Sequence, residues 1–233
     1  MKIFVWWVVK LFAITYRSLF FWCNYVILPT FWGCRFILPK KGFSSYLLLS
    51  IMSGLYELEW RSYFDRFISS CDIFVDVGAA ADGYYSLRAF KKNGNIKSFA
   101  IEPVRFELSF LVKNIIINGA VGKIIPLKVA LGRDNKEIML NNERTYMATL
   151  DSLAEKLNLP KVDVIKIDVE GMGLNVLLGA MKIIIKNKPI IFLEVHNKFE
   201  EEALQLLKSK GYHAILRGKK FIIFIPENLD LTA

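Results

Sequence analysis

Acidic side chains are missing from the first quarter of this sequence. The first acidic residue is Glu57, and the 56 residues before it carry six of the nine net positive charges of the 233-residue chain. Those cations are Lys2, Lys10, Arg17, Arg35, Lys40 and Lys41. Because they alternate with apolar runs and form no continuous basic patch, they favour contact with an anionic membrane surface, and no nucleic acid partner is expected.

Cysteines and glycosylation signals are also scarce. Cys23, Cys34 and Cys71 are odd in number and show neither a C-x-x-C motif nor zinc-type spacing, so neither a disulfide framework nor a thiolate metal site is expected. The sequence contains no N-x-S/T sequon. We therefore expect reduced cysteines and a cytoplasmic protein associated with the inner face of the membrane.

Long uninterrupted apolar runs are missing from the N-terminal segment as well. Apolar residues dominate 3–28, but Lys10, Arg17 and Asn24 interrupt them at intervals of seven, which on a helix places these three on one narrow polar stripe. A spanning helix needs about 20 consecutive apolar residues, so the pattern predicts a helix that lies in the membrane interface. Two alternatives stay open: a spanning or signal-anchor helix, and a helix that packs on the rest of the protein or on a second subunit.

Tryptophan supports the interfacial hypothesis, because indole rings favour the headgroup region of a bilayer. The N-terminal tryptophans are Trp6, Trp7, Trp22 and Trp32. We expect peripheral membrane contact through residues 1–38. The chain then divides into an apolar basic segment over 1–42, a helical lead-in over 43–70 with one amphipathic helix at 44–67, and an α/β domain over 71–233.

Strands and helices alternate regularly from residue 73 onward. The expected strands are 73–77, 98–101, 123–130, 162–167 and 189–195, and the expected helices are 83–93, 103–118, 151–158, 174–185 and 198–210. Gly94 and Gly119 follow two of these helices, where a left-handed cap is favoured. Two β-rich runs, 212–216 and 221–225, predict a closing hairpin. The sequence thus predicts a Rossmann-like α/β sheet with an antiparallel C-terminal hairpin, the pattern of class I methyltransferases, preceded by an apolar helical segment.

A candidate cofactor loop follows the strand at 73–77. Asp76, Gly78 and Gly83 lie where this strand ends and a helix begins, at the sheet edge where open α/β folds bind ligands. The small residues between the glycines keep the loop thin. Glu102 ends the next strand, 19 residues after Gly83, where a carboxylate can accept hydrogen bonds from two ribose hydroxyls.

The spacing of the loop distinguishes between two nucleotide-type cofactors. A nicotinamide enzyme normally has G-x-G-x-x-G to hold a phosphate, whereas Gly78 and Gly83 give G-x-x-x-x-G. S-adenosylmethionine has no phosphate, and its sulfonium cation suits the acidic side chains of Asp76 and Asp82. We therefore expect S-adenosylmethionine as the cofactor, with a nicotinamide-dependent oxidoreductase as a weaker alternative.

Five segments of the sequence together resemble the FkbM-type methyltransferases over roughly residues 70–225. They are FVDVGAAADGYYSL, IEPVRFELSFLVKNIIING, TLDSL, VDVIKIDVEGMGLNVLLGA and PIIFLEVHN. The family loop usually reads like DVGANIGYYSL, so the loop here is one residue longer between Asp76 and Gly83. The resemblance implies a cofactor site made of Asp76, Gly78, Ala79, Asp82, Gly83, Tyr84, Glu102, Pro103, Ala130, Leu131 and Asp168, with adenine contacts at Ala130 and Leu131.

Candidate catalytic residues end the strands at 162–167 and 189–195. Lys166, Asp168 and Glu170 alternate, so on an extended strand they face the same side, and Glu194 and His196 end the next strand in the same way. A lysine inside an apolar strand needs a carboxylate partner or a functional reason. We expect Asp168 to be the catalytic base, with His196 second and Glu194 and Lys166 beside them. Alternatively, Asp168 and Glu170 cap the following helix, and His196 is an ordinary loop residue.

These residues and the resemblance together predict an S-adenosylmethionine-dependent O-methyltransferase. The acceptor is expected to be a small molecule or glycan, with the hydroxyl belonging to a sugar, glycan or glycolipid-type molecule. Mg²⁺ held by Asp168 and Glu194 is a further candidate, since oxygen ligands suit this ion. A degenerate fold that serves as a binding or scaffold protein is the non-enzymatic alternative.

Overall fold

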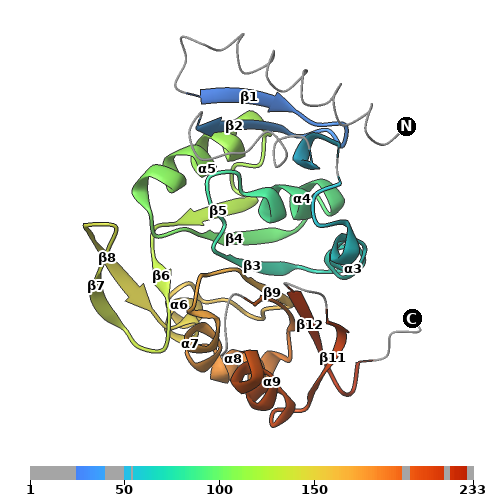
Figure 1. Cartoon of the computed structure of the whole chain (residues 1–233), viewed down its shortest axis with the longest axis vertical. Helices are drawn as coiled ribbons and strands as arrows, with labels where there is room; N and C mark the ends of the chain where they lie inside the picture. The colour runs from blue at the N-terminus through green and yellow to red at the C-terminus, as the bar shows by residue number, and fades with distance from the viewer. Residues whose placement is uncertain (1–24, 40–49, 54, 196–199, 218–220, 230–233) are drawn as a thin grey trace.

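The computed structural model describes residues 25–39, 50–53, 55–195, 200–217 and 221–229. Its centre is a seven-stranded sheet in the order β11-β12-β10-β9-β3-β4-β5. The strands are β3 (Ile73–Val77), β4 (Lys97–Ile101), β5 (Ile124–Leu127), β9 (Val164–Ile167), β10 (Ile190–Glu194), β11 (Tyr212–Arg217) and β12 (Phe221–Pro226). Neighbouring strands from β5 to β10 are parallel, and β12 is antiparallel to both β10 and β11. The predicted α/β sheet with a closing hairpin is therefore confirmed, and Figure 1 shows its strands one below another from β5 through β4, β3 and β9 to β12 and β11.

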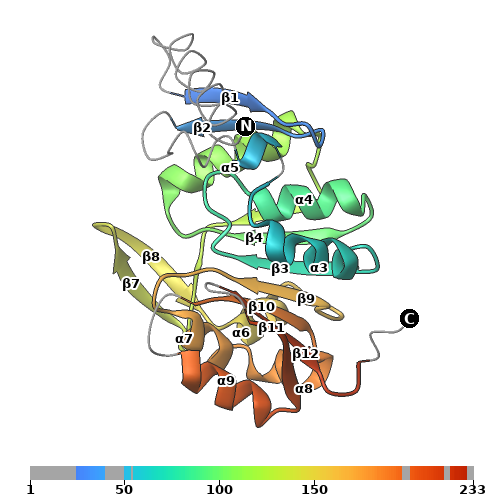
Figure 2. The ribbon, with the colours of Figure 1, turned by 45° about the vertical axis from the view of Figure 1, so that its right-hand side comes forward.

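Helices cover both faces of this sheet, because alternate residues of its strands point to opposite sides. In β3, Phe74 belongs to one hydrophobic core, and Val75 and Val77 belong to the other. The first core is built with α3 (Leu58–Ile68), α4 (Tyr84–Lys92) and α5 (Arg105–Ile117). The second is built with α6 (Leu150–Lys156), α7 (Gly173–Leu178), α8 (Met181–Asn187) and α9 (Glu200–Lys208). Figure 2 shows these two helix groups apart, with α3 to α5 above and α6 to α9 below.

An N-terminal hairpin replaces the last part of the helix expected over 3–28. Strands β1 (Tyr25–Pro29) and β2 (Arg35–Pro39) pair antiparallel. Burial alternates along β1, with Val26 and Leu28 inside, a period of two that fits a strand and not a helical stripe. The helix expectation is therefore wrong for 25–28, and residues 1–24 lie outside the described residues. In the part of the chain that is described, no helix is long and apolar enough to cross a membrane.

The lead-in is not one helix over 44–67 as expected. Within its described residues, helix is found at 50–53 and again in α3, with an interruption at 55–57. Glu57 takes a left-handed backbone conformation (φ 49°), which cannot continue a right-handed helix. Trp60, Phe64 and Ile68 of α3 are buried at a spacing of four, so the amphipathic character predicted for this segment applies to α3.

The expected strand at 123–130 divides between two sheets. β5 ends at Leu127, and β6 (Ala130–Leu131) joins a second, three-stranded sheet with β7 (Lys136–Leu140) and β8 (Glu143–Ala148). Asn141 and Asn142, both left-handed, form the turn between β7 and β8. Neither strand of this hairpin was predicted from the sequence.

Two expected helix features also change. The helix over 174–185 divides into α7 and α8 at Gly179, where a Cβ atom would lie 2.0 Å from the carbonyl oxygen of Gly132.

Gly119 has the left-handed conformation expected of a cap (φ 68°). Gly94 is outside that region, because α4 ends one residue earlier at an extended Asn93 whose amide donates to the carbonyls of Ile68 and Cys71.

Candidate functional site

The carboxylate of Asp76 anchors the loop between β3 and α4. Asp76 is 1% exposed, and its Oδ2 accepts hydrogen bonds from the backbone N–H of Ser86 at 3.1 Å and from the Ser86 hydroxyl at 2.8 Å. Its Oδ1 lies 3.7 Å from the Lys166 ammonium and accepts no hydrogen bond from any described residue. Burial raises the pKa of Asp76, and Lys166 opposes this shift. The loop thus presents a buried acidic oxygen with spare capacity for a donor or a cation.

Three residues of this loop have left-handed backbone. Gly78 (φ 80°) has no room for a Cβ atom, which would lie 2.0 Å from the carbonyl oxygen of Asp168. Gly83 (φ 60°) would bring a Cβ atom within 2.4 Å of the Leu111 side chain. Between them, Ala80 (φ 54°) also takes this conformation. This unusual alanine lies within the stretch between Asp76 and Gly83 that is one residue longer than the family pattern.

Glu102 lies beside the loop at the carboxyl end of β4. Its Oε2 accepts from the N–H of Ala80 at 3.1 Å, and its Oε1 accepts from the N–H of Val104 at 2.8 Å. The intervening Pro103 has no N–H to offer. Burial raises the pKa of Glu102 to about 7. A carboxylate held in this way beside a thin loop fits the ribose of an adenosine-type cofactor.

Asp82 and Tyr84 complete the loop. The Asp82 carboxylate accepts from the N–H of Tyr84 at 3.1 Å, and burial raises the pKa of Asp82 to about 7. Ala79 and Tyr84 are both buried. Ala130 and Leu131, the expected adenine contacts, lie in β6 of the second sheet, where Leu131 is buried and Ala130 half-buried.

Lys166 connects the loop to the expected catalytic rim. It is the neighbour of Asp76 across the parallel strands β9 and β3, and its Nζ lies 3.0 Å from Oδ2 of Asp168. Burial lowers the pKa of Lys166, but Asp168 and Asp76 outweigh this and raise it overall. The ammonium also lies 5.0 Å from the ring centre of Tyr85. Lys166 therefore has two carboxylate partners, Asp76 and Asp168, as expected for a lysine inside an apolar strand.

Asp168 and Glu194 meet because β9 and β10 are adjacent and parallel. Burial, followed by a hydrogen bond with Asp168 and its negative charge, raises the pKa of Glu194 to about 9. Glu170 is exposed in a turn and does not join this pair. His196, the second candidate base, lies outside the described residues.

The geometry adds two residues that the sequence analysis did not select. The hydroxyl of Tyr85 donates a hydrogen bond to Glu57, whose charge interacts with Lys166 and Asp168. Burial raises the pKa of Glu57. Glu57 is visible in the sequence as the first acid, but nothing local indicates that the lead-in returns to the end of β9.

The expected magnesium site gains no support. The Lys166 ammonium already lies beside Asp168, where a cation would be held. Among the residues with described positions, no group of three or more His, Cys, Asp or Glu side chains could hold a metal ion. The described residues therefore give no support for a resident Mg²⁺.

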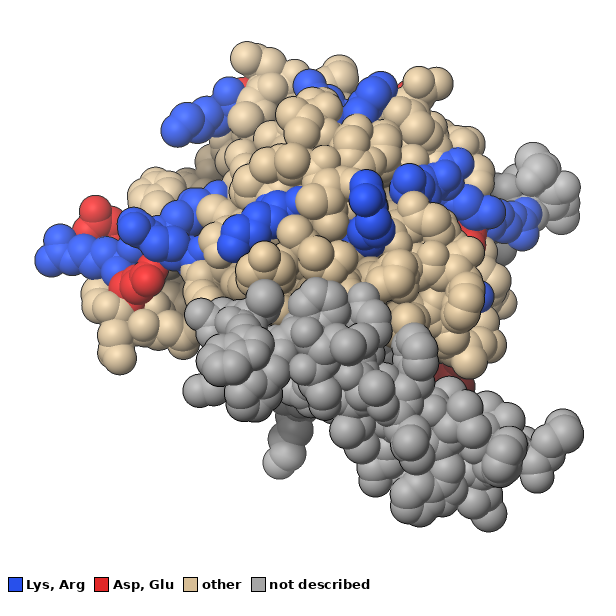
Figure 3. Space-filling view, turned by 90° about the horizontal axis from the view of Figure 1, so that it is seen from above, with Lys and Arg blue, Asp and Glu red and all other residues tan. Residues whose placement is uncertain are grey.

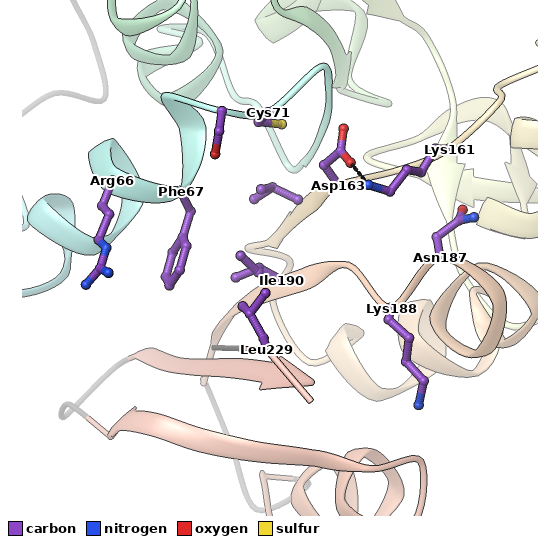
Figure 4. A pocket seen from close by; sticks show the side chains of 11 residues that line it. Arg66, Phe67, Cys71, Lys161, Asp163, Asn187, Lys188, Ile190 and Leu229 are labelled. Carbon is purple, nitrogen blue, oxygen red and sulfur yellow. Dashed lines mark ion pairs between the residues drawn. The ribbon is translucent and has the colours of Figure 1, made fainter. Parts of the chain in front are cut away.

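A cavity of about 380 Å³ lies at the opposite edge of the sheet, where β9 and β10 begin (Figure 4). Its lining includes Arg66, Cys71, Lys161 and Asp163. Asp163 is already satisfied, because Lys161 lies at 2.6 Å and the N–H groups of residues 72 and 73 donate to it. Because the cavity lies where β9 and β10 begin, and Asp168 and Glu194 lie where these strands end, it is separate from the cofactor loop and the acidic rim.

Comparisons with known proteins identify the family and the fold of this chain. The Methyltransferase FkbM domain matches residues 76–214. A methyltransferase FkbM structure from Methylobacillus flagellatus KT is similar at 18% identity and a TM-score of 0.58, covering 77% of this chain. This chain spans only 54% of that protein. No curated protein matches the sequence significantly.

Two further solved structures share the fold. A putative transferase, PH0793 from Pyrococcus horikoshii, has 17% identity and a TM-score of 0.52, with coverage of 87% of this chain and 70% of the other. M. jannaschii TYW2 in complex with AdoMet has 18% identity and a TM-score of 0.50, with coverage of 87% and 84%. At these identities the likeness is one of fold.

Proposed function

This chain belongs to the FkbM methyltransferase family, and from that premise we propose that it transfers the methyl group of S-adenosylmethionine to a hydroxyl of a sugar, glycan or glycolipid-type acceptor. The observation that carries the proposal is the arrangement of Asp76, Gly78 and Glu102 at the carboxyl ends of adjacent parallel strands. This is the edge at which open α/β sheets bind their ligands.

The cofactor half of the site follows from these three residues. Glu102 would accept hydrogen bonds from the two ribose hydroxyls, in exchange for its present backbone donors. Asp76 and Asp82 supply negative charge toward the cationic methionine end. S-adenosylmethionine, when bound, supplies a methyl group on an electron-poor sulfur. Gly78 lets the loop lie against the backbone of Asp168, so that donor and base are neighbours.

The acceptor half is the rim of Asp168, Glu194 and Glu57. Lys166 favours the ionised form of Asp168, which accepts the hydrogen bond of the acceptor hydroxyl. Asp168 would accept the proton of the acceptor hydroxyl, whose oxygen would receive the methyl group that S-adenosylmethionine supplies. The carboxyl groups of Glu57, Asp168 and Glu194 interact electrostatically with one another, and such a set suits an acceptor with several hydroxyls. His196 stays a second candidate base.

We also propose peripheral contact of residues 1–38 with the cytoplasmic face of a membrane. In the N-terminal hairpin, Phe31 is 90% exposed, and Tyr25 and Ile27 are more than a third exposed. These apolar side chains lie in a part of the sequence with no acidic residue. Figure 3 shows Lys and Arg spread across the upper face of the molecule with few acidic side chains among them. Apolar anchors beside cations suit anionic lipid headgroups.

Calorimetric titration with S-adenosylmethionine tests the cofactor assignment. The chain should bind it, Glu102→Ala should weaken binding roughly a hundredfold through two lost charge-assisted hydrogen bonds, and Asp168→Asn should still bind. A folded chain that binds no S-adenosylmethionine would support the scaffold alternative. Binding of NADH instead would support the oxidoreductase.

Activity and membrane contact need separate measurements. Turnover with a labelled cofactor and a glycan or lipid extract should be lost in Asp168→Asn. For the membrane, the full chain should sediment with vesicles that contain phosphatidylserine and not with purely zwitterionic ones. Phe31→Ser should weaken this binding several-fold, whereas Tyr146→Ser, a matched exposed aromatic on β8, should not. Equal sedimentation with both kinds of vesicle would contradict the proposal.

A further inference from the structure

The side chain of Asn114 in α5 joins two parts of the chain that the sequence keeps far apart. Asn114 is fully buried, and its Oδ1 accepts from the N–H of Ile37 in β2 at 2.5 Å. Its Nδ2 donates to the carbonyl of Ile37 at 3.0 Å and to the carbonyl of Ala81 at 2.8 Å. One amide therefore holds the N-terminal hairpin and the cofactor loop together.

Asn118 makes the matching contact one helical turn later. Its Oδ1 accepts from the N–H of Arg35 at 2.9 Å, and its Nδ2 donates to the carbonyl of Arg35 at 2.6 Å. Residues four apart on a helix and two apart on a strand both advance by roughly 6 to 7 Å, so the two amides follow the strand in register. They occupy the edge of β2 as a third strand would.

The hairpin fixes the orientation of the Asn114 amide. Ile37 holds both its oxygen and its nitrogen, so the amide cannot turn away from Ala81 without losing buried hydrogen bonds. Ala81 is itself fully buried, and its carbonyl belongs to the peptide unit that precedes Asp82. The contact therefore acts on the part of the loop that carries Ala80 and Asp82.

We propose that Asn114 is a positioning residue for the cofactor loop and that the β1–β2 hairpin supports cofactor binding by holding its amide. The hairpin lies outside residues 76–214, the part of the chain that matches the FkbM domain. The cofactor site of this protein thus depends on an N-terminal element that is linked to the loop by the hydrogen bonds of this side chain. Trp32 and Phe36 of the hairpin also pack against the ring of Tyr84. This inference rests on the proposed use of S-adenosylmethionine.

Asn118 supplies a matched control, because it binds the hairpin but not the loop. In the full chain, Asn114→Ala should weaken S-adenosylmethionine binding at least about tenfold by calorimetry, while Asn118→Ala should change it less than about threefold. Both variants should lower the urea midpoint of unfolding. Hydrogen exchange of the loop at 78–83 should quicken in Asn114→Ala and stay unchanged in Asn118→Ala.

Ile37→Pro tests whether the hairpin supports cofactor binding. It removes the N–H that donates to Oδ1 of Asn114, and it leaves the sequence of α5 and of the loop unaltered. It should also weaken cofactor binding. Unchanged affinity and loop exchange in Asn114→Ala would overturn the inference, as would equal losses in Asn114→Ala and Asn118→Ala. Unchanged affinity in Ile37→Pro would overturn the hairpin's role. If the unaltered chain binds no S-adenosylmethionine, the proposed function itself fails.

Discussion

The ammonium of Lys166 lies 3.0 Å from the carboxylate of Asp168, two positions further along the chain. The same ammonium lies 3.7 Å from Asp76 on the neighbouring strand. A single buried cation thus connects the residue that anchors the cofactor loop with the proposed base. Because Lys166 is 3% exposed, these contacts are little screened by water.

Replacing Lys166 should destabilise the protein strongly. Lys166→Met leaves Asp76 buried without its cation, and breaking a buried pair in this way costs about 3–5 kcal/mol. Urea unfolding at pH 7 measures the change. Lys186→Met, an exposed lysine on α8, should stay within about 0.5 kcal/mol of the unaltered protein. Similar midpoints for both variants would contradict the ion-pair interpretation.

Cofactor affinity should rise with pH around neutrality. Burial raises the pKa of Glu102 from 4.5 to about 7, so its contribution to folding stability is full below about pH 4.5 and is lost as pH rises through about 7. The pH dependence of cofactor affinity has the opposite sign, because the ionised carboxylate accepts hydrogen bonds from both ribose hydroxyls. Affinity for S-adenosylmethionine should therefore rise roughly tenfold between pH 6 and 8.

Calorimetry at pH 6, 7 and 8 checks this expectation, with Glu102→Gln as the variant that should lose the Glu102 share of the dependence. Asp82, whose pKa is also raised to about 7, supplies any remaining share, and Asp82→Asn separates it. Affinity that falls as pH rises would show that Glu102 does not bind the cofactor as a carboxylate.

Gly78 should tolerate no side chain. In Gly78→Ala the new Cβ would meet the carbonyl oxygen of Asp168 at 2.0 Å on a left-handed backbone, so the loop and the end of β9 must separate. We expect a loss of more than about 2 kcal/mol and of cofactor binding. Gly94→Ala, with no atom within 4 Å and no left-handed backbone, should be neutral or slightly stabilising in a thermal melt. Equal melting temperatures for the two variants would be inconsistent with this packing.

Asp151 should stabilise a helix other than its own. It lies in α6, but its two carboxylate oxygens accept from the N–H groups of Lys182 at 2.9 Å and Ile183 at 3.0 Å, in the first turn of α8. Asp151→Ala should lower the free energy of unfolding by about 1–2 kcal/mol through loss of this cap. Glu155→Ala, exposed on α6, serves as the control and should have little effect in urea.

The sequence by itself determined the order of the strands and helices that build the seven-stranded sheet, and it predicted where the candidate site lies. A short apolar run between turn residues is a local property, so strands such as Ile73–Val77 and the closing hairpin were predictable. So was the placement of Asp76, Glu102 and Asp168 at strand ends, because a residue's position relative to its own strand needs no knowledge of the rest of the fold.

Only the tertiary structure decided which of these residues meet. Lys166 contacts Asp76 because β9 lies beside β3, and Glu57 reaches the rim because the lead-in folds back over α4, two facts that no local pattern contains. The run at Tyr25–Pro29 was apolar enough for a helix, but it forms a strand because it pairs with β2. The amide of Asn114 in turn holds the other edge of β2. The second of these contacts joins residues 77 positions apart, and it exists only once the chain has folded.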